Sequence, residues 1–182
     1  MAVRESLLGL LTLGPAYGLQ LHAELGSRAP HRAKTNVGQV YGTLDRLTTA
    51  GLVTHNGLTP DGLPLYTLTT AGQNEAQSWL RGESLTAVPE WADLQDVVLI
   101  SSSVDSDSAH ALLNAVEKLS EPPVAAVESS PATELRLLAQ QRYLEAVRSW
   151  ISDVRSAQIQ PHAGYALGRP KRGRPAKSSL VQ

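Results

Sequence analysis

The spacing of apolar residues along the first 82 positions predicts four helices and one β-hairpin. Residues 4–13 are rich in leucine, as in a buried helix, and Gly14 and Pro15 end that run. Turn residues such as Asn56-Gly57 separate two short strands. We expect helices over residues 4–13, 16–26, 36–50 and 70–81, and strands over residues 52–55 and 65–68. Three helices, a hairpin and a fourth helix are the order of a winged helix-turn-helix, so the predicted fold class is mainly α with a small β-hairpin.

The second half of the chain has the pattern of a helical dimerisation domain. Helices are expected over residues 89–100, 105–119 and 131–158. In the last helix, apolar residues repeat at heptad spacing at Leu137, Leu144, Val147, Ile151 and Val154. A helix of about 28 residues is ~42 Å long, which is too long for the preceding helix to cover, so we expect a second copy of the chain as its partner. The predicted domains are residues 1–82, residues 89–160 and a flexible basic tail over residues 161–182.

The third helix has an apolar face and a polar face. Val40, Leu44 and Leu47 lie on the apolar stripe, with Tyr41 at its margin. The opposite face is nearly free of acid, and its candidate DNA contacts are Thr35, Asn36, Gly38, Gln39, Tyr41, Gly42, Thr43 and Arg46. Gln pairs with adenine and Arg with guanine or phosphate. Two glycines cost roughly 1 kcal/mol each in a helix but let a DNA backbone come close; an ordinary solvated face, the alternative, leaves them unexplained.

Charge is distributed unevenly along the chain. The formal net charge is only −1, but residues 1–58 carry +2, residues 59–160 carry −8 and residues 161–182 carry +5. The tail sequence Lys-Arg-Gly-Arg-Pro at 171–175 resembles an AT-hook, in which a Gly-Arg-Pro core lies in the narrow minor groove of A·T-rich DNA. We predict minor-groove contacts by Arg169, Lys171, Arg172, Gly173, Arg174 and Pro175. A solubilising basic tail is the alternative, and a nuclear-localisation signal would require a eukaryote.

Three segments resemble the PadR family of bacterial transcription regulators: LLGLLTLGPAYGLQLHAEL at 7–25, GQVYGTLDRLTTAGLV at 38–53 and PLYTLTTAGQ at 64–73. The resemblance implies a winged helix-turn-helix whose third helix enters the major groove, and a helical C-terminal part that pairs two protomers. It also implies small planar or phenolic effectors, and a correspondence between Tyr41 and the family's tyrosine in the third helix. Similar wings carry Lys or Arg, whereas residues 58–66 here hold no cation and one Asp, which makes a poor phosphate clamp.

Three tryptophans are present in a chain that has no phenylalanine. Indole faces suit planar aromatic ligands, so Trp91 and Trp150 are candidate effector contacts between two protomers. Packing in the core or in a dimer interface is the alternative.

The sequence shows no pattern typical of an enzyme, a metal site or a membrane protein. Cysteine is absent, which removes disulfides and thiolate metal sites. The histidines lack metal-ligand spacing, Asp105 and Asp107 lack the later residues of a calcium loop, and no nucleophile elbow is present. No run approaches the ~20 apolar residues of a membrane-spanning helix. We expect a cytoplasmic bacterial protein that uses no cofactor.

These patterns together predict a homodimeric transcription regulator, a repressor, that reads a pseudo-palindromic operator in double-stranded DNA with two copies of residues 36–50. Two alternatives stay open. One is an architectural, nucleoid-associated protein that binds A·T-rich DNA without a dedicated operator. The other is that the acidic middle, residues 59–160, docks a protein partner while the N-terminal domain holds the DNA.

Overall fold

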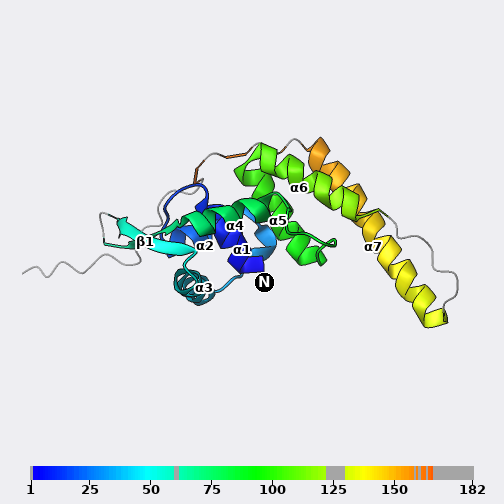
Figure 1. The fold of residues 1–182 in the computed structure, drawn as a ribbon, viewed down its shortest axis with the longest axis horizontal. Coiled ribbons are helices and arrows are strands. Elements are labelled where there is room, and N and C mark those ends of the chain that lie inside the picture. Colours follow the sequence, from blue (N-terminus) through cyan, green and yellow to red (C-terminus); the bar gives the residue numbers. More distant parts are fainter. Residues whose placement is uncertain are drawn as a thin grey trace, which may run out of the picture.

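The computed structural model describes residues 2–59, 62–121 and 130–157, together with residues 159, 161, 162, 164 and 165. Its helices are α1 (Ala2–Leu11), α2 (Gly18–Arg28), α3 (Val37–Thr49), α4 (Thr70–Leu80), α5 (Trp91–Val104), α6 (Ser106–Leu119) and α7 (Pro131–Ser156), with a short 3-10 turn at Pro30–Arg32. Strands β1 (Val53–Leu58) and β2 (Pro64–Leu68) form an antiparallel hairpin. The predicted fold class is confirmed (Figure 1).

Local sequence signals set the ends of these elements. The side-chain oxygens of Asn36, Thr69 and Asp105 accept hydrogen bonds from backbone amides in the first turns of α3, α4 and α6. Gly51 follows the C-terminal end of α3 with a φ of 70°, a left-handed conformation that favours glycine. Helix α5 differs most from its expected bounds: residues 89–100 were expected, whereas the helix begins at Trp91 and continues to Val104.

Two hydrophobic clusters share helix α5. The first cluster contains residues of helices α1, α2, α3 and α4 and of the hairpin. The second contains residues of α5, α6 and the second half of α7. Ile100 of α5 belongs to the first cluster and Leu94 to the second, while Trp79 of α4 packs against both. The N-terminal and C-terminal helices are therefore packed together through α4 and α5.

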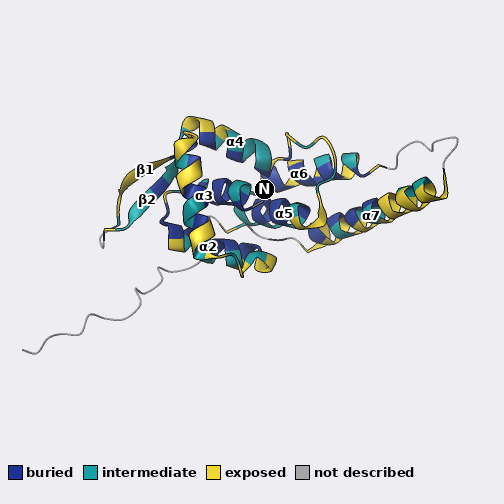
Figure 2. Cartoon of the chain, turned by 90° about the horizontal axis from the view of Figure 1, so that it is seen from below, coloured by how far each residue is buried: buried dark blue, intermediate teal, exposed yellow. Residues whose placement is uncertain are grey.

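Helix α7 is covered by its own chain over its second half only. The predicted dimer-seam residues on that half are buried, none more than 9% exposed: Leu144, Val147, Ile151 and Val154. The last three pack against α5 and α6 within the one chain, so this half of the helix is covered without a second copy, and pairing of two chains through it stays a prediction. The first half of α7 projects from the body (Figure 1, Figure 2). On it, Leu135 and Leu138 are 68% and 47% exposed, and Leu137 is partly exposed.

Beyond α7 the chain returns to the N-terminal helices, as its orange segment shows (Figure 1). The amide of His162 donates to the carbonyl of Ser103 at 3.0 Å, and the hydroxyl of Tyr165 donates to the carbonyl of Gly14 at 2.6 Å. These contacts differ from the expectation of a flexible tail that begins at residue 161. The predicted minor-groove residues, 169 and 171–175, lie outside the described residues.

Candidate nucleic-acid interface

Helix α3 lies at the surface beside the hairpin and exposes its polar face (Figure 1, Figure 2). Val40, Leu44 and Leu47 are at most 1% exposed within the first hydrophobic cluster. Gln39 and Arg46 lie on the opposite side and are exposed, as the apolar spacing of the helix predicts. The helix can therefore present both side chains to a partner.

The start of α3 is held by hydrogen bonds that also occupy two predicted DNA contacts. The side-chain oxygen of Asn36 accepts from the amide of Gly38 at 2.7 Å, so this oxygen serves the helix cap. The Nε2 atom of His22, on α2, donates to the carbonyl of Thr35 at 2.8 Å. His22 thus positions the start of α3, a role that sequence reasoning missed because the two residues lie on different elements. The exposed Lys34, which just precedes the cap, was also missed as a candidate phosphate contact.

Thr43 has a different role from the one predicted. Its side chain is buried, with 4% of the residue exposed, so it offers little surface for the direct DNA contact that the sequence predicts. The Thr43 hydroxyl donates to the carbonyl of Gln39 at 2.8 Å and accepts from the guanidinium of Arg46 at 3.0 Å. It therefore holds Arg46 in place, as buried second-layer hydrogen bonds hold functional side chains elsewhere.

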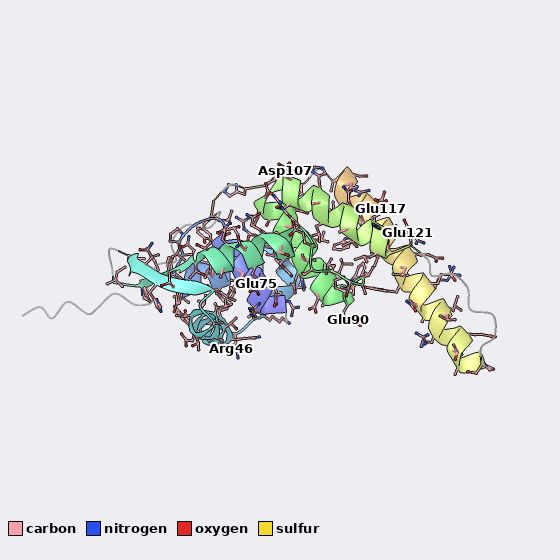
Figure 3. All side chains as sticks on the ribbon, in the orientation of Figure 1. Arg46, Glu75, Glu90, Asp107, Glu117 and Glu121 are labelled. Atoms are coloured by element: carbon pink, nitrogen blue, oxygen red, sulfur yellow. The ribbon has the colours of Figure 1, made fainter. Side chains whose placement is uncertain are left out.

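Arg46 differs from the other arginines that line the same groove. The groove is about 590 Å³ in volume and lies between α3, the start of α1 and the start of α5. In it, Arg32 hydrogen-bonds to Asp96 at 2.6 Å, and Arg4 pairs with Glu5 and Glu75. Among the described residues no carboxylate pairs with Arg46, which lies on α3 at the edge of the molecule (Figure 3). Its charge is therefore available to an anionic partner.

Packing within the chain explains the glycine at position 18 but not the glycine at position 42. A Cβ atom at Gly18, the first residue of α2, would lie 2.5 Å from the ring of Tyr41, so this glycine lets the tyrosine pack against α2. A Cβ atom at Gly42 would meet nothing within 4 Å. No packing contact in the described structure therefore requires a glycine at position 42, whereas close approach of a DNA backbone would.

Asp45 is an exposed acid on α3 that the predicted DNA-facing surface did not include. At helical spacing it falls on the same stripe as Gly38 and Gly42. Burial, followed by the charge of Asp45, raises the pKa of Tyr66 at the base of the hairpin. The surface of α3 thus carries one free cation and one acid, so it suits selective contacts better than a uniform attraction to phosphate.

The hairpin is a wing without a strong cation. His55 and Tyr66 are opposite each other in the strand register, with ring centroids 4.7 Å apart. The register shifts between His55 and Leu58, where Gly57 adopts a φ of 86°. Leu58 is 67% exposed. Neutral and apolar groups on this surface give phosphates little to bind, which agrees with the weak clamp expected from the sequence.

The candidate effector residues meet within one chain. The indole centroids of Trp91 and Trp150 are 5.2 Å apart, and Tyr143 lies edge-on to Trp91 at 6.3 Å. The Tyr143 hydroxyl donates to the carbonyl of Pro89, which fixes the cluster at the start of α5. A spacing of 5.2 Å is that of two rings in direct contact, so a flat ligand cannot lie between them. Trp91, which is 39% exposed, still offers an outer surface.

The part of the chain that the structure describes was also compared with the requirements of a membrane-spanning helix and of a metal site. None of its helices combines the length and apolar character of a membrane span. Nor do its His, Asp and Glu side chains gather in groups of three that could hold a metal ion.

Comparison with known proteins finds a similarity in the N-terminal part of the chain. Residues 7–78, which carry α2, α3 and the wing, match the family model described as the transcriptional regulator PadR-like family. A solved structure of Bacillus subtilis PadR in complex with operator DNA is similar over 87% of this chain and 99% of that chain, with 19% sequence identity and a TM-score of 0.42. No curated protein matches the chain.

Proposed function

We propose that this chain is a transcription regulator that inserts α3 of its PadR-like domain into the major groove of an operator. The observation that carries the proposal is the exposed guanidinium of Arg46, which is held by Thr43 and has no carboxylate partner among the described residues. An arginine in this state contacts guanine or phosphate without first breaking an ion pair. Gln39 beside it adds an amide that suits adenine.

Replacing Arg46 tests this proposal. Arg46→Ala removes the free cation but leaves the buried stripe of α3 untouched, so affinity for operator DNA should fall about tenfold or more, because one good base pair contact contributes roughly 1–3 kcal/mol. The thermal midpoint of unfolding should stay within about 2 °C of the parent chain, as for other surface changes. Fluorescence anisotropy with duplexes selected from a random pool measures the affinity.

Arg136→Ala is the matched control, because Arg136 is also exposed but lies on the projecting half of α7. It should leave the affinity unchanged if α7 does not contact DNA. Equal affinities for the Arg46→Ala variant and the parent chain would remove α3 from the interface. A selection that enriches only A·T content, with no defined site, would favour the architectural alternative.

Repression is the proposed direction of regulation, by a homodimer. Two copies of α3 related by a two-fold axis would contact half-sites about one helical turn, ~34 Å, apart. The exposed leucines on the projecting half of α7 support a second copy as the partner of that helix, since such a surface is costly to leave in water. For a small aromatic effector, the outer face of Trp91 is the proposed contact.

A further inference from the structure

Arg28 of α2 connects three distant parts of the chain. Its guanidinium donates to Glu24 at 2.8 Å, to the carbonyl of Ser103 at 2.7 Å and to the carbonyl of Gly164 at 2.7 Å. The side chains of Arg28 and Glu24 are 5% and 0% exposed. A buried guanidinium needs an acceptor for each of its N–H groups, so the segment around Gly164 completes a site that α2 and α5 leave open.

Tyr165 attaches the same segment to the end of α1. Its hydroxyl donates to the carbonyl of Gly14 at 2.6 Å and lies 3.3 Å from the carbonyl of Leu10, and its ring packs against the first hydrophobic cluster. The last carbonyls of a helix lack partners within that helix, and Tyr165 is a second donor to the carbonyl of Leu10 beside the amide of Leu13. Burial raises the pKa of Tyr165, so the hydroxyl keeps the proton that it donates. Gly164 precedes it with a φ of 120°, which favours glycine at this turn.

This attachment point lies near both α3 and the wing. Two residues after Gly14, Ala16 forms a bridge to Tyr66 of β2. Four residues after Gly14, Gly18 contacts the ring of Tyr41 on α3. Four residues span at most ~14 Å, so Tyr165 is bound within a short distance of the DNA-facing helix. Without these contacts, the C-terminal segment would be attached to the body only at Ser156, the end of α7, whose second half packs in the second hydrophobic cluster.

The basic segment of residues 168–177 begins directly beyond this point in the sequence. It holds five cations and no acid. Arg169 is four residues and Arg174 nine residues after Tyr165, so they can lie at most ~14 Å and ~32 Å from it. Both distances are shorter than one turn of B-DNA, ~34 Å, so a segment rooted at Tyr165 can only reach DNA close to the α3 site.

We propose that the contacts of Arg28 with Gly164 and of Tyr165 with Gly14, here called the anchor, hold the root of the basic segment beside α3. The segment then enters the A·T-rich minor groove that flanks the α3 site on the same duplex, and supplies the cations that the wing lacks. This inference rests on the proposed DNA-binding function. Loss of the anchor lengthens the linker before Arg172 from seven residues to the sixteen that separate it from Ser156, which lowers the effective concentration of the segment roughly threefold.

Binding to duplexes with different flanks tests the anchor in the full chain. A duplex selected by the parent protein is prepared with A·T tracts or with G·C sequence on both sides of the same central site. The parent chain should prefer the A·T-flanked duplex, and the double variant Arg172→Ala, Arg174→Ala should lose that preference. Tyr165→Ala should reduce the preference about threefold or more, while leaving affinity for the G·C-flanked duplex unchanged. An undiminished preference in Tyr165→Ala would overturn the anchor.

A cleavage probe locates the segment directly. The chain has no cysteine, so Ser178→Cys provides a unique attachment point for an iron chelate that cuts nearby DNA. We expect one compact group of cuts beside the central site, which spreads over more base pairs when Tyr165→Ala is added. An equally compact group in both proteins would contradict the proposal.

Two controls separate the anchor from general damage. Tyr143→Phe also removes a hydroxyl that donates to a backbone carbonyl, but in the tryptophan cluster, and should leave cleavage compact. Tyr165→Phe keeps the packed ring and loses only the hydrogen bonds to the carbonyls of Gly14 and Leu10, so it should give an intermediate result. Failure of the proposed function would look different, because Arg46→Ala would then bind the central site as tightly as the parent chain, and the inference would fall with it.

Discussion

At the scale of single residues, the glycines show which positions of α3 packing explains. At Gly72 of α4, a Cβ atom would lie 1.9 Å from the carbonyl oxygen of Leu52, so packing requires the glycine. A Cβ atom at Gly42 would meet no atom within 4 Å among the residues that the structure describes. A glycine inside a helix costs roughly 1 kcal/mol relative to alanine, and no packing contact among the described residues compensates for it at Gly42.

Gly42→Ala should therefore change stability and function in opposite directions. We expect the free energy of unfolding to rise by about 1 kcal/mol, while affinity for operator DNA falls, because the added methyl group holds the DNA backbone away. Urea unfolding and fluorescence anisotropy measure the two quantities. Gly72→Ala is the contrasting variant and should be strongly destabilised. Unchanged DNA affinity in Gly42→Ala would mean that DNA does not approach this stripe of α3.

Asp45 belongs to the same stripe and should oppose non-specific binding. A carboxylate about 4 Å from a phosphate in water is repelled by about 1 kcal/mol. Asp45→Asn should thus raise affinity for random duplex DNA roughly fivefold and weaken discrimination in favour of the selected site. Competition of labelled operator with random DNA measures both effects. Identical non-specific affinity would place Asp45 outside the interface.

At the scale of elements, α5 fixes the position of α3 through one buried carboxylate. Asp96 is fully buried, and its carboxylate accepts hydrogen bonds from the Nε atom of Arg32 at 3.0 Å and from the Nη2 atom at 2.6 Å. His31 lies 2.8 Å from the same carboxylate. Both partners lie in the 3-10 turn that connects α2 to the start of α3, so the C-terminal helices help to orient α3.

Asp96→Asn should therefore weaken DNA binding without touching DNA. The change removes the negative charge opposite Arg32, and we expect a loss of roughly 2 kcal/mol in the free energy of unfolding, since bonds to charged groups contribute about 1.5–3 kcal/mol. Affinity for operator should fall as well, because the turn before α3 loosens. Asp93→Asn is the matched control: Asp93 lies 3.7 Å from Arg32 and its side chain is 46% exposed, so little should change. A stable Asp96→Asn variant with parental affinity would contradict this coupling.

Elements with local signals were predictable, and long-range packing was not. Apolar spacing and the cap at Asn36 were enough to predict α3 and its exposed face. The heptad pattern of α7 correctly indicated an apolar surface at Val147 and Ile151, but periodicity cannot tell which helix covers such a surface. Likewise, nothing local connects Tyr165 with Gly14, whose contact spans 151 residues of sequence. The buried position of Thr43 was missed because it lies at the margin of the apolar stripe.

At the scale of the whole molecule, the projecting half of α7 should decide the oligomeric state. Leu135 and Leu138 are three positions apart along α7 and therefore share one face of the helix. The double variant Leu135→Gln, Leu138→Gln should sediment as a monomer in analytical ultracentrifugation, whereas the parent chain should sediment as a dimer. Since both side chains are exposed within the single chain, the monomer should keep its helical circular-dichroism spectrum.

The same variant links assembly to function. A dimer that spans two half-sites gains affinity from simultaneous contact, since the second half-site is bound at a high effective concentration. The monomeric variant should thus bind a single half-site as well as the parent chain does, but lose its preference for the paired site. Leu58→Gln is the matched control, because Leu58 is 67% exposed on the wing and should not affect sedimentation. If the double variant remains dimeric, the two chains must pair through another face. If the parent chain is itself a monomer, the two-fold operator no longer belongs to the proposal, but the proposed contacts of α3 with DNA are unaffected.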